Sequence, residues 1–263
     1  MIVSSSPYTA TMEHIERRVS NGAGAVVQES IFEGQIYREA ASLDRMEGYG
    51  DTGEYLERYL GDAYKGEFLE LNIFLLPTDR HADAVQLEQG YAEIVRKEAG
   101  AVKVPVSVKL PMRLTNVLSV CGALLARVLF NRFFEPDIDI EKMSFVSGDP
   151  FSEAGELRNV LRSTALCAHV LPQLDIAVST GVHDGEAAVK ALLCGASAVQ
   201  VCSAIHKSGY EVIGEISRFI DDWAARHGFD SLEAFRGRMD YGSAEGDHYQ
   251  RVQYMKYFPH GVE

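Results

Sequence analysis

Residues 175–205 place the tightest constraint on how this chain folds. The small and β-branched residues 176–178 are typical of a parallel strand that is buried on both faces. A polar turn follows, and Asp184 is placed to cap a helix that ends near Gly195. A second apolar strand, 198–201, comes directly afterwards. Strand, helix and strand in so few residues predict a right-handed βαβ crossover within a parallel sheet.

The turns that follow these two strands, 179–182 and 202–204, are expected to lie side by side, because both strands end at the same edge of the sheet. Their small residues allow backbone N–H groups to approach an anion closely, and nearby helix N-termini favour negative charge. The sequence therefore predicts a phosphate site, which in a (β/α)8 barrel follows strands 7 and 8. The alternative is that the small residues serve only tight packing between strand and helix.

Length and composition narrow the class of protein. The 263 residues fit one barrel domain, 1–263, with 228–263 expected as a C-terminal tail packed on its outside. A formal charge of −13 argues against nucleic acid as a partner. No apolar run approaches the roughly 20 residues of a membrane span, so no membrane partner is expected. The four cysteines form no CxxC pair and no signal peptide is evident, which predicts reduced, mostly buried thiols in a cytoplasmic protein without a metal site.

The rest of the chain alternates predicted strands and helices. Strands are expected at 2–3, 25–27, 68–73, 104–109 and 128–131, and helices at 12–21, 82–99, 116–125, 155–171 and 212–227. Together with the opening stretch this gives seven strands, whereas the barrel needs eight. The gap falls between Val27 and Phe68, where a polar segment predicts a loop with a short helix near 54–60. The sequence thus predicts a (β/α)8 TIM barrel with one βα unit missing or not represented.

Several motifs in the same order resemble the dihydroorotate dehydrogenase family, which are FMN oxidoreductases built on a (β/α)8 barrel. They are GAGAVV at 22, ELNI at 70, VPVSVKL at 104, VLFNRFFEPDIDIE at 128, STGVHDGEAAVKALLCGASAVQVCSA at 179, FRGR at 235 and QYMKYF at 253. The chain looks most like the dihydroorotate dehydrogenase-like branch. The resemblance implies hydride transfer between FMN and the CH–CH group of a small planar substrate, with dihydroorotate oxidation in pyrimidine biosynthesis as the suggested reaction. It also implies a homodimer.

The resemblance implies roles for eight residues. Lys109 matches the lysine that reaches the pyrimidine edge of the flavin and stabilises negative charge on the reduced ring; the alternative is a strand-end lysine in solvent. Asn72 and Asn131 match asparagines that bind substrate, and Asn131 also flavin, although asparagine commonly just forms turns. Ser5 matches the turn beside the flavin. The FMN phosphate would be held by the two turns, through Ser179, Gly181, Cys202 and Ser203.

The chain also departs from the family pattern at the reacting end of the site. The family places a cysteine or serine base in the loop after the ELNI strand, but here that loop carries Leu75, Leu76 and Thr78, and the catalytic residue is unknown. Glu29 stands where a second family lysine is expected. The leader that would close the barrel floor before Met1 has no counterpart either. A true deletion and a sequence assembled from parts of a larger protein both explain such gaps.

These departures leave other functions open. One alternative is a non-redox barrel that keeps the phosphate turns and binds a phosphorylated metabolite or serves as a subunit. A weaker one is a non-flavin lyase or isomerase, for which no convincing acid/base pair is present. His183 and Asp184 could be imagined as a base and its orienting carboxylate, but Asp184 is better used as a helix cap. The acidic segment 136–141 lacks the spacing of a calcium loop, so we expect a solvated loop there.

Overall fold

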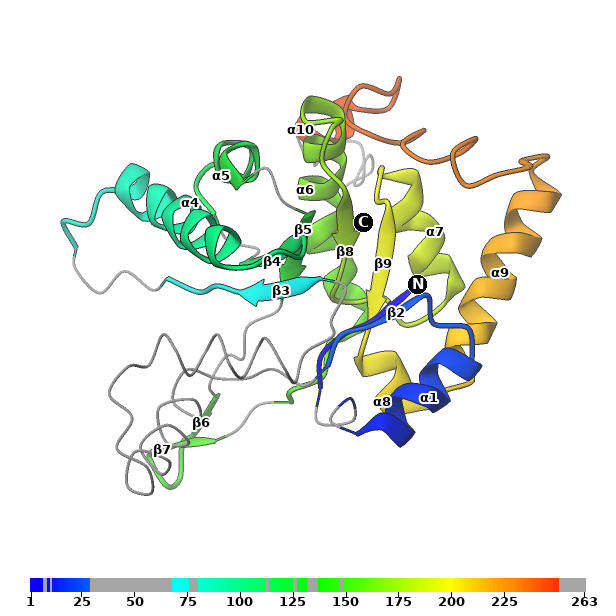
Figure 1. Cartoon of the computed structure of the whole chain (residues 1–263), viewed down its shortest axis with the longest axis horizontal. Coiled ribbons are helices and arrows are strands. Elements are labelled where there is room, and N and C mark those ends of the chain that lie inside the picture. The colour runs from blue at the N-terminus through cyan, green and yellow to red at the C-terminus, as the bar shows by residue number, and fades with distance from the viewer. Residues whose placement is uncertain are drawn as a thin grey trace, which may run out of the picture.

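The protein is a mixed α/β structure whose central feature is a parallel sheet (Figure 1). The computed structural model describes residues 1–6, 9, 11–28, 68–75, 80–111, 114–124, 127–131, 137–146 and 149–250. All seven predicted strands are present. They are β1 (Ile2–Val3), β2 (Ala25–Val26), β3 (Leu69–Asn72), β4 (Val106–Pro111), β5 (Arg127–Asn131), β8 (Ile176–Val178) and β9 (Ala198–Val201).

The strands follow the order β2-β1-β9-β8-β5-β4-β3, and every neighbouring pair is parallel. Apart from β2 and β3, successive strands of this sheet lie side by side, and the first strand pairs with the last, with Ile2 opposite Gln200. This is the cyclic order of a (β/α)8 barrel, opened between β2 and β3. Among the described residues the strands form no closed barrel. The segment that joins β2 to β3, including the predicted helix at 54–60, lies outside the described residues.

Contacts across the inside of the sheet show that it is strongly curved. The amide Nε2 of Gln200 on β9 donates to Glu70 Oε2 on β3 at 2.8 Å, although three strands lie between them. Neighbouring strands are about 4.8 Å apart, so in a flat sheet these two strands would be about 19 Å apart, beyond the joint reach of the two side chains. The sheet therefore rolls β3 back toward β9, as a barrel requires.

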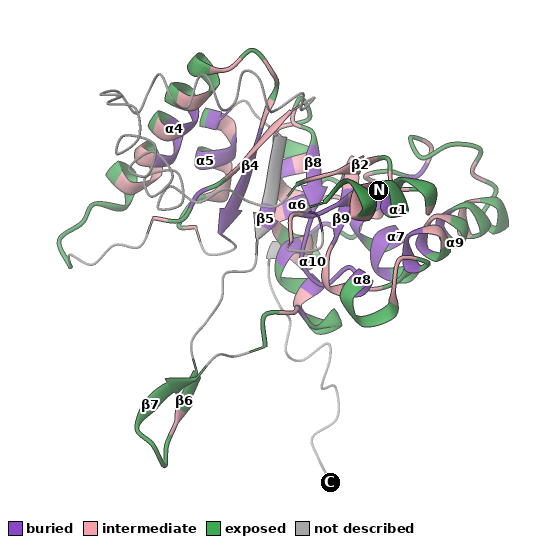
Figure 2. Cartoon of the chain, turned by 60° about the horizontal axis from the view of Figure 1, so that its bottom comes forward, coloured by how far each residue is buried: buried purple, intermediate pink, exposed green. Residues whose placement is uncertain are grey.

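The helices pack in chain order around the outside of this curved sheet. Contacts join α4 to α5, α5 to α6, α6 to α7, and α7 to α9. In Figure 2 the central strands β4, β8 and β9 are buried, whereas the outer face of α9 is exposed. The helices are α1 (Met12–Ser20), α4 (Ala84–Ala101), α5 (Val117–Leu124), η2 (Ala154–Glu156), α6 (Leu157–Val170), α7 (Gly185–Leu193), α8 (Ser203–Ser208), α9 (Val212–Arg226) and α10 (Asp247–Gln250).

The predicted helix ends are confirmed by their caps. Asp184 Oδ1 accepts a hydrogen bond from the backbone N–H of Ala187 at 2.8 Å, which caps α7. Gly195 follows α7 with φ +103°, a conformation that glycine adopts readily. Thr11 caps α1 in the same way as Asp184 caps α7, though with a longer contact of 3.4 Å to His14 N. One expectation was wrong: the second polar turn, 202–204, is not only a turn, because α8 begins within it.

The acidic segment forms an exposed hairpin rather than the expected loop. Strands β6 (Asp137–Asp139) and β7 (Ser144–Val146) pair antiparallel and stand away from the sheet (Figure 2). Asp139 Oδ1 accepts from the backbone N–H groups of Glu141 and Lys142, both at 3.0 Å. These hydrogen bonds, with that of Lys142 foremost, lower the pKa of Asp139. Asp139, one of the acidic residues of this segment, thus stabilises the turn of the hairpin.

The C-terminal residues that the structure describes pack on α6 and α7. Phe235 is fully buried, and its ring lies 5.1 Å from that of Trp223 on α9. The backbone N–H groups of Gly237 and Met239 donate to carbonyls at the end of α7, and that of Tyr241 donates to Ala165 of α6. The motif at 253–258 lies outside the described residues.

Two expectations from composition can be compared with the described part of the chain. No helix there has both the length and the apolar character needed to cross a membrane. All four cysteines carry free thiols; Cys121, Cys167 and Cys194 are buried, and Cys202 is partly exposed.

The cap of α7 provides a first test, because this helix precedes the strand that carries one of the two polar turns. Asp184→Ala should lower the free energy of unfolding by about 1 kcal/mol, since the N–H of Ala187 loses its partner. Asp184→Asn keeps a capping oxygen and should stay close to the wild type. Urea unfolding of both variants measures the difference. Equal stability of the two variants would show that the cap contributes nothing.

Candidate functional site

A polar cavity of about 170 Å³ lies where the strands of the sheet end. It gathers seven of the eight residues to which the resemblance gives a binding role, and these come from turns and strands far apart in the sequence. The described residues that line it are Ser4, Ser5, Asn72, Lys109, Pro150, Ser152, Ser179, Thr180, Gly181, Val182, Gln200, Cys202 and Ser203.

The two asparagines have different outcomes. Asn72 ends β3 and lines the cavity. Asn131 ends β5, where its backbone lies opposite Pro111, but its side chain lies outside what the structure describes. Its predicted role therefore stays a prediction.

Lys109 is the one charged residue among the described residues that line the cavity. It lies on β4 with only 5% of its surface exposed, so the alternative of a strand-end lysine in solvent is wrong. Its Nζ forms an ion pair with Glu70 Oε1 at 2.8 Å and donates to Ser4 Oγ at 2.8 Å. Two fixed acceptors therefore hold the ammonium group at the cavity.

Glu70 stands behind Lys109 and is equally buried. One carboxylate oxygen contacts Lys109, and the other accepts from Gln200 Nε2 at 2.8 Å. This contact fixes the orientation of the Gln200 amide, because the opposite orientation would place an amide oxygen against the carboxylate. Gln200 Oε1 is then buried without a hydrogen-bond partner among the described residues. Polar side chains from four strand regions thus meet inside the sheet.

The first polar turn, 179–182, has an unusual backbone. Thr180 and Gly181 adopt φ values of +78° and +77°, so two successive residues are left-handed. A Cβ on Gly181 would overlap the backbone of Leu157 at the start of α6. The glycine is therefore required by packing against α6. This agrees with the packing alternative for Gly181, although the residue also lines the cavity.

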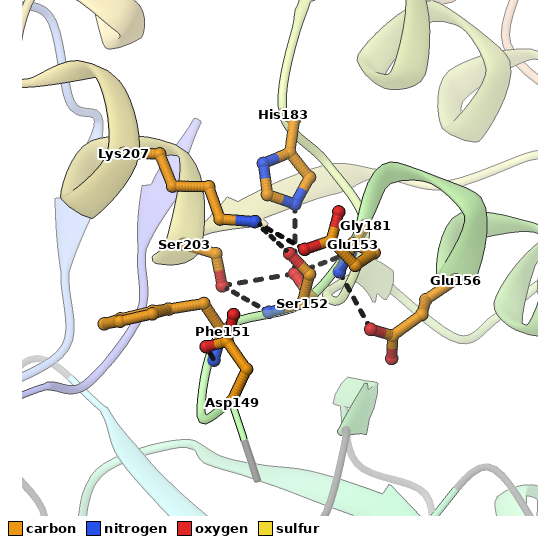
Figure 3. Close-up of polar contacts among 9 residues, drawn as sticks. All are labelled: Asp149, Phe151, Ser152, Glu153, Glu156, Gly181, His183, Ser203 and Lys207. Atoms are coloured by element: carbon orange, nitrogen blue, oxygen red, sulfur yellow. Dashed lines mark hydrogen bonds and ion pairs between the residues drawn. The ribbon is translucent and has the colours of Figure 1, made fainter.

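Ser152, which the sequence did not reveal, bridges the two polar turns (Figure 3). Its Oγ accepts from Gly181 N–H at 3.3 Å and donates to Ser203 Oγ at 3.1 Å. Its backbone N–H also donates to Ser203 Oγ at 2.9 Å. Lys207 of α8 fixes the same segment by donating to the carbonyl of Ser152 and pairing with Glu153, both at 3.0 Å. The segment before η2 is therefore a third wall of the predicted phosphate site.

His183 contacts this bridge instead of working with its sequence neighbour. Its Nε2 lies 3.2 Å from Ser152 Oγ (Figure 3), whereas Asp184 is used to cap α7. The base and orienting carboxylate imagined from the sequence are not brought together. His183 instead adds an imidazole to the polar cluster around Ser152.

Cys202 directly follows the strand β9, is the first residue of the second turn and lines the cavity. Burial raises the pKa of its thiol, and the positive charge of Lys109 opposes this only in part. A hydrogen bond with Ser6 and the charge of Arg18 act in the same direction as Lys109. The thiol is therefore neutral near pH 7, where it can donate a weak hydrogen bond but is a poor nucleophile.

The loop where the family base is expected turns away from the cavity where it is described. The N–H of Leu75 donates to the hydroxyl of Tyr91 on α4 at 3.2 Å, and its side chain packs against Gly90 of the same helix. Leu75 does not line the cavity. Leu76, Thr78 and Glu29 lie outside the described residues.

Sequence reasoning missed Ser4, Glu70, Ser152 and Gln200. The sequence did contain a signal for Glu70. Glu70 and Asn72 are two residues apart on one strand, and Ser107 and Lys109 are two apart on the next. Residues spaced in this way point to the same face of a sheet. In the register Glu70 lies opposite Ser107, and Asn72 opposite Lys109. Two polar pairs on one face of apolar strands predict a polar interior. No comparable pattern marks Ser152.

Removing one partner of the buried ion pair between Lys109 and Glu70 should lower the free energy of unfolding far more than removing one partner of an exposed ion pair. Lys109→Met leaves the Glu70 carboxylate buried without its cation, and the free energy of unfolding should fall by about 3–5 kcal/mol. Adding Glu70→Gln to this variant should recover most of the loss. Lys190→Met, which breaks the exposed pair with Glu186, should change stability by at most about 0.5 kcal/mol. Denaturant unfolding of the three variants measures this, and similar losses for Lys109→Met and Lys190→Met would contradict it.

Comparison with known proteins gives partial matches. No family model matches the chain. A Streptococcus agalactiae protein assigned to dihydroorotate dehydrogenase A (fumarate) is 36% identical over 94 residues, which are 36% of this chain and 29% of the relative. A Streptococcus pneumoniae protein assigned to the same enzyme is 39% identical over 70 residues, 27% of this chain and 22% of the relative.

A yeast relative gives a longer but weaker match. Dihydroorotate dehydrogenase (fumarate) of Saccharomyces bayanus is 29% identical over 109 residues, 39% of this chain and 35% of the relative. Each of these matches spans about a third or less of the length of the relative. Over the matched part, this chain is related to dihydroorotate dehydrogenases.

Proposed function

We propose that this protein is an FMN-dependent oxidoreductase resembling dihydroorotate dehydrogenase, with its sheet forming most of a (β/α)8 barrel. The observation that carries the proposal is the single cavity at the strand ends, which brings together seven of the eight residues implied by the resemblance. These residues come from β1, β3, β4, β8 and β9 or from the turns after them. The partial similarity to dihydroorotate dehydrogenases supports the same conclusion.

The chemistry of the donors suits a flavin phosphate at one end of the cavity. The hydroxyls of Ser179 and Ser203 and the backbone N–H groups of residues 179 and 180 are uncharged hydrogen-bond donors of two adjacent turns that line the cavity. Such groups bind phosphate oxygens at close range. Ser152 is an addition to the predicted set, because it contacts both turns.

Lys109 and Asn72 suit the ring of the cofactor or substrate at the other end. The Lys109 ammonium group is a buried cation held by Glu70 and Ser4. Asn72 offers both a donor and an acceptor, which matches a planar ligand that alternates carbonyl and N–H groups. FMN, when bound, would supply the capacity to accept or release a hydride, and these residues would hold and polarise its ring.

Dihydroorotate is the proposed substrate because the relatives carry that name. No described residue that lines the cavity is a strong base at neutral pH, since Cys202 is a neutral thiol and Lys109 is ion-paired. We propose that the proton is exchanged with water or with a side chain outside the lining. The cytoplasmic location and the homodimer are proposals drawn from the sequence.

One observation favours a second candidate. Leu75 packs on α4, so the described part of the base loop contributes nothing to the cavity. A barrel that binds a phosphorylated metabolite without redox chemistry would need only the polar turns. The loss of one base can alter the reaction of an enzyme, whereas several cofactor-binding residues would not be expected to remain together without a use. The flavoprotein therefore remains the first proposal.

The spectrum of the purified protein tests the function directly. We expect a yellow protein that releases close to one FMN per chain on denaturation. If FMN is lost during purification, adding it back at about 100 times its Kd should stabilise the fold by about 2.7 kcal/mol, seen as a rise in Tm. A colourless protein that FMN does not stabilise, but that other phosphate esters do, would favour the non-redox alternative.

Alkylation of Cys202 tests whether FMN occupies this cavity. Because burial raises the pKa of Cys202, its thiolate fraction at a given pH below that pKa is smaller than that of an ordinary thiol. Labelling by iodoacetamide should therefore be slow at pH 7 and accelerate toward alkaline pH, and bound FMN should suppress it. Mass spectrometry with Cys202→Ser as the control assigns the modified site. Equal labelling of Cys202 with and without FMN would place the flavin elsewhere.

A further inference from the structure

The charge that the cavity presents to a ligand depends on a residue outside its lining. Lys109 is the one charged residue among the described residues of the lining, and Glu70 lies directly behind it. Both side chains are about 95% buried, so bulk water screens their interaction poorly. The field at the cavity is therefore that of an ion pair and not that of an isolated cation.

The position of the Glu70 carboxylate is fixed from two sides. Lys109 Nζ contacts one oxygen and Gln200 Nε2 donates to the other, both at 2.8 Å. Gln200 belongs to β9 and Lys109 to β4, so movement of the carboxylate would break contacts with two separate strands. Ser4 Oγ also accepts a hydrogen bond from the ammonium group. Both the geometry and the charge balance of the pair are thus built into the fold.

We propose that Glu70 is a positioning residue that sets how much of the positive charge of Lys109 reaches the ligand. This rests on the proposed function, in which the ligand ring belongs to FMN. The reduced ring carries more negative charge than the oxidised ring, so a cation beside it favours reduction. By offsetting Lys109, Glu70 weakens that preference and keeps the cavity compatible with the uncharged, oxidised ring.

Among the described residues, Arg18 is another charge near the cavity. Arg18 on α1 is buried, acts on the Cys202 thiol and lies with its guanidinium 4.9 Å from the centre of the Tyr210 ring. It does not line the cavity. Of the described carboxylates, Glu70 is the one in direct contact with Lys109, so its removal should have the largest effect on the field at the ring.

The test is the reduction potential of FMN bound to Glu70→Gln, measured by reductive titration against a reference dye. The substitution preserves shape but removes the charge, and the potential should move to more positive values. Reduced FMN should gain affinity relative to oxidised FMN by about tenfold or more, as expected for one unscreened charge a few ångströms away. Glu186→Gln makes the same chemical change in an exposed pair and should leave the potential unchanged.

A double variant that exchanges the charges of Glu70 and Gln200 tests whether the change in potential comes from charge and not from altered structure. Glu70→Gln combined with Gln200→Glu keeps an amide against a carboxylate but moves the negative charge onto a residue that lines the cavity. Its potential should therefore fall below that of the single variant, because a carboxylate again lies near the ligand. Lys109→Met should shift the potential in the opposite direction, to more negative values.

The possible failures are distinguishable. If FMN does not bind to the wild type, the proposed function fails. If FMN binds but Glu70→Gln and the charge exchange both keep the wild-type potential, the inference about Glu70 is overturned while the proposed function stands. If the single variant unfolds, Lys109→Met with and without Glu70→Gln decides the matter, because equal potentials in these two variants would show that the charge of Glu70 does not reach the ligand.

Discussion

The buried ion pair between Lys109 and Glu70 connects the architecture of this protein to its site. Taking two charges out of water is costly, and the hydrogen bonds of Lys109 to Ser4 and of Gln200 to Glu70 offset part of that cost. Gln200 lies on β9 and Ser4 directly follows the neighbouring strand β1, whereas Glu70 and Lys109 lie on β3 and β4 toward the other edge, so these contacts require the sheet to curve. β3 forms one edge of the described sheet, and its inward carboxylate ties it back to β9. The same atoms that favour curvature therefore define the charge at the cavity.

The two ends of the cavity are built in different ways. The proposed phosphate end comes mainly from one continuous stretch, 175–205, in which the strand, the capped helix and the second strand are neighbours along the chain. The proposed ring end is assembled from residues that are distant in sequence: 105 positions separate Lys109 from Ser4, and 130 separate Gln200 from Glu70. Local structure alone can position the first, whereas the second depends on the whole sheet.

This difference explains what could be predicted from the sequence. The crossover, its Asp184 cap and the seven strands follow from local patterns of apolar residues, turns and caps, and the structure confirms them. Glu70 and Gln200 were missed because an inward-facing polar residue is recognisable only when its partner across the sheet is known. Ser152 was missed for a related reason: an isolated serine before a helix is usually a turn residue, and only the fold places it between two turns. The acidic segment has turn chemistry that suits a hairpin equally well, so its residues did not distinguish hairpin from loop.

The structure explains why the loop after β3, where the chain departs from the family pattern, does not contribute to the cavity where it is described. Leu75 follows β3 directly, and its backbone and side chain both contact α4, so the chain leaves the cavity as soon as the strand ends. Asn72, three residues earlier, is still at the cavity because its strand is held by the contacts of Glu70. A substitution in the loop can therefore change the chemistry without disturbing the grip on a ligand, whereas a substitution at Glu70 or Lys109 changes both. For this reason the binding end of such a site is expected to persist longer than its reacting end.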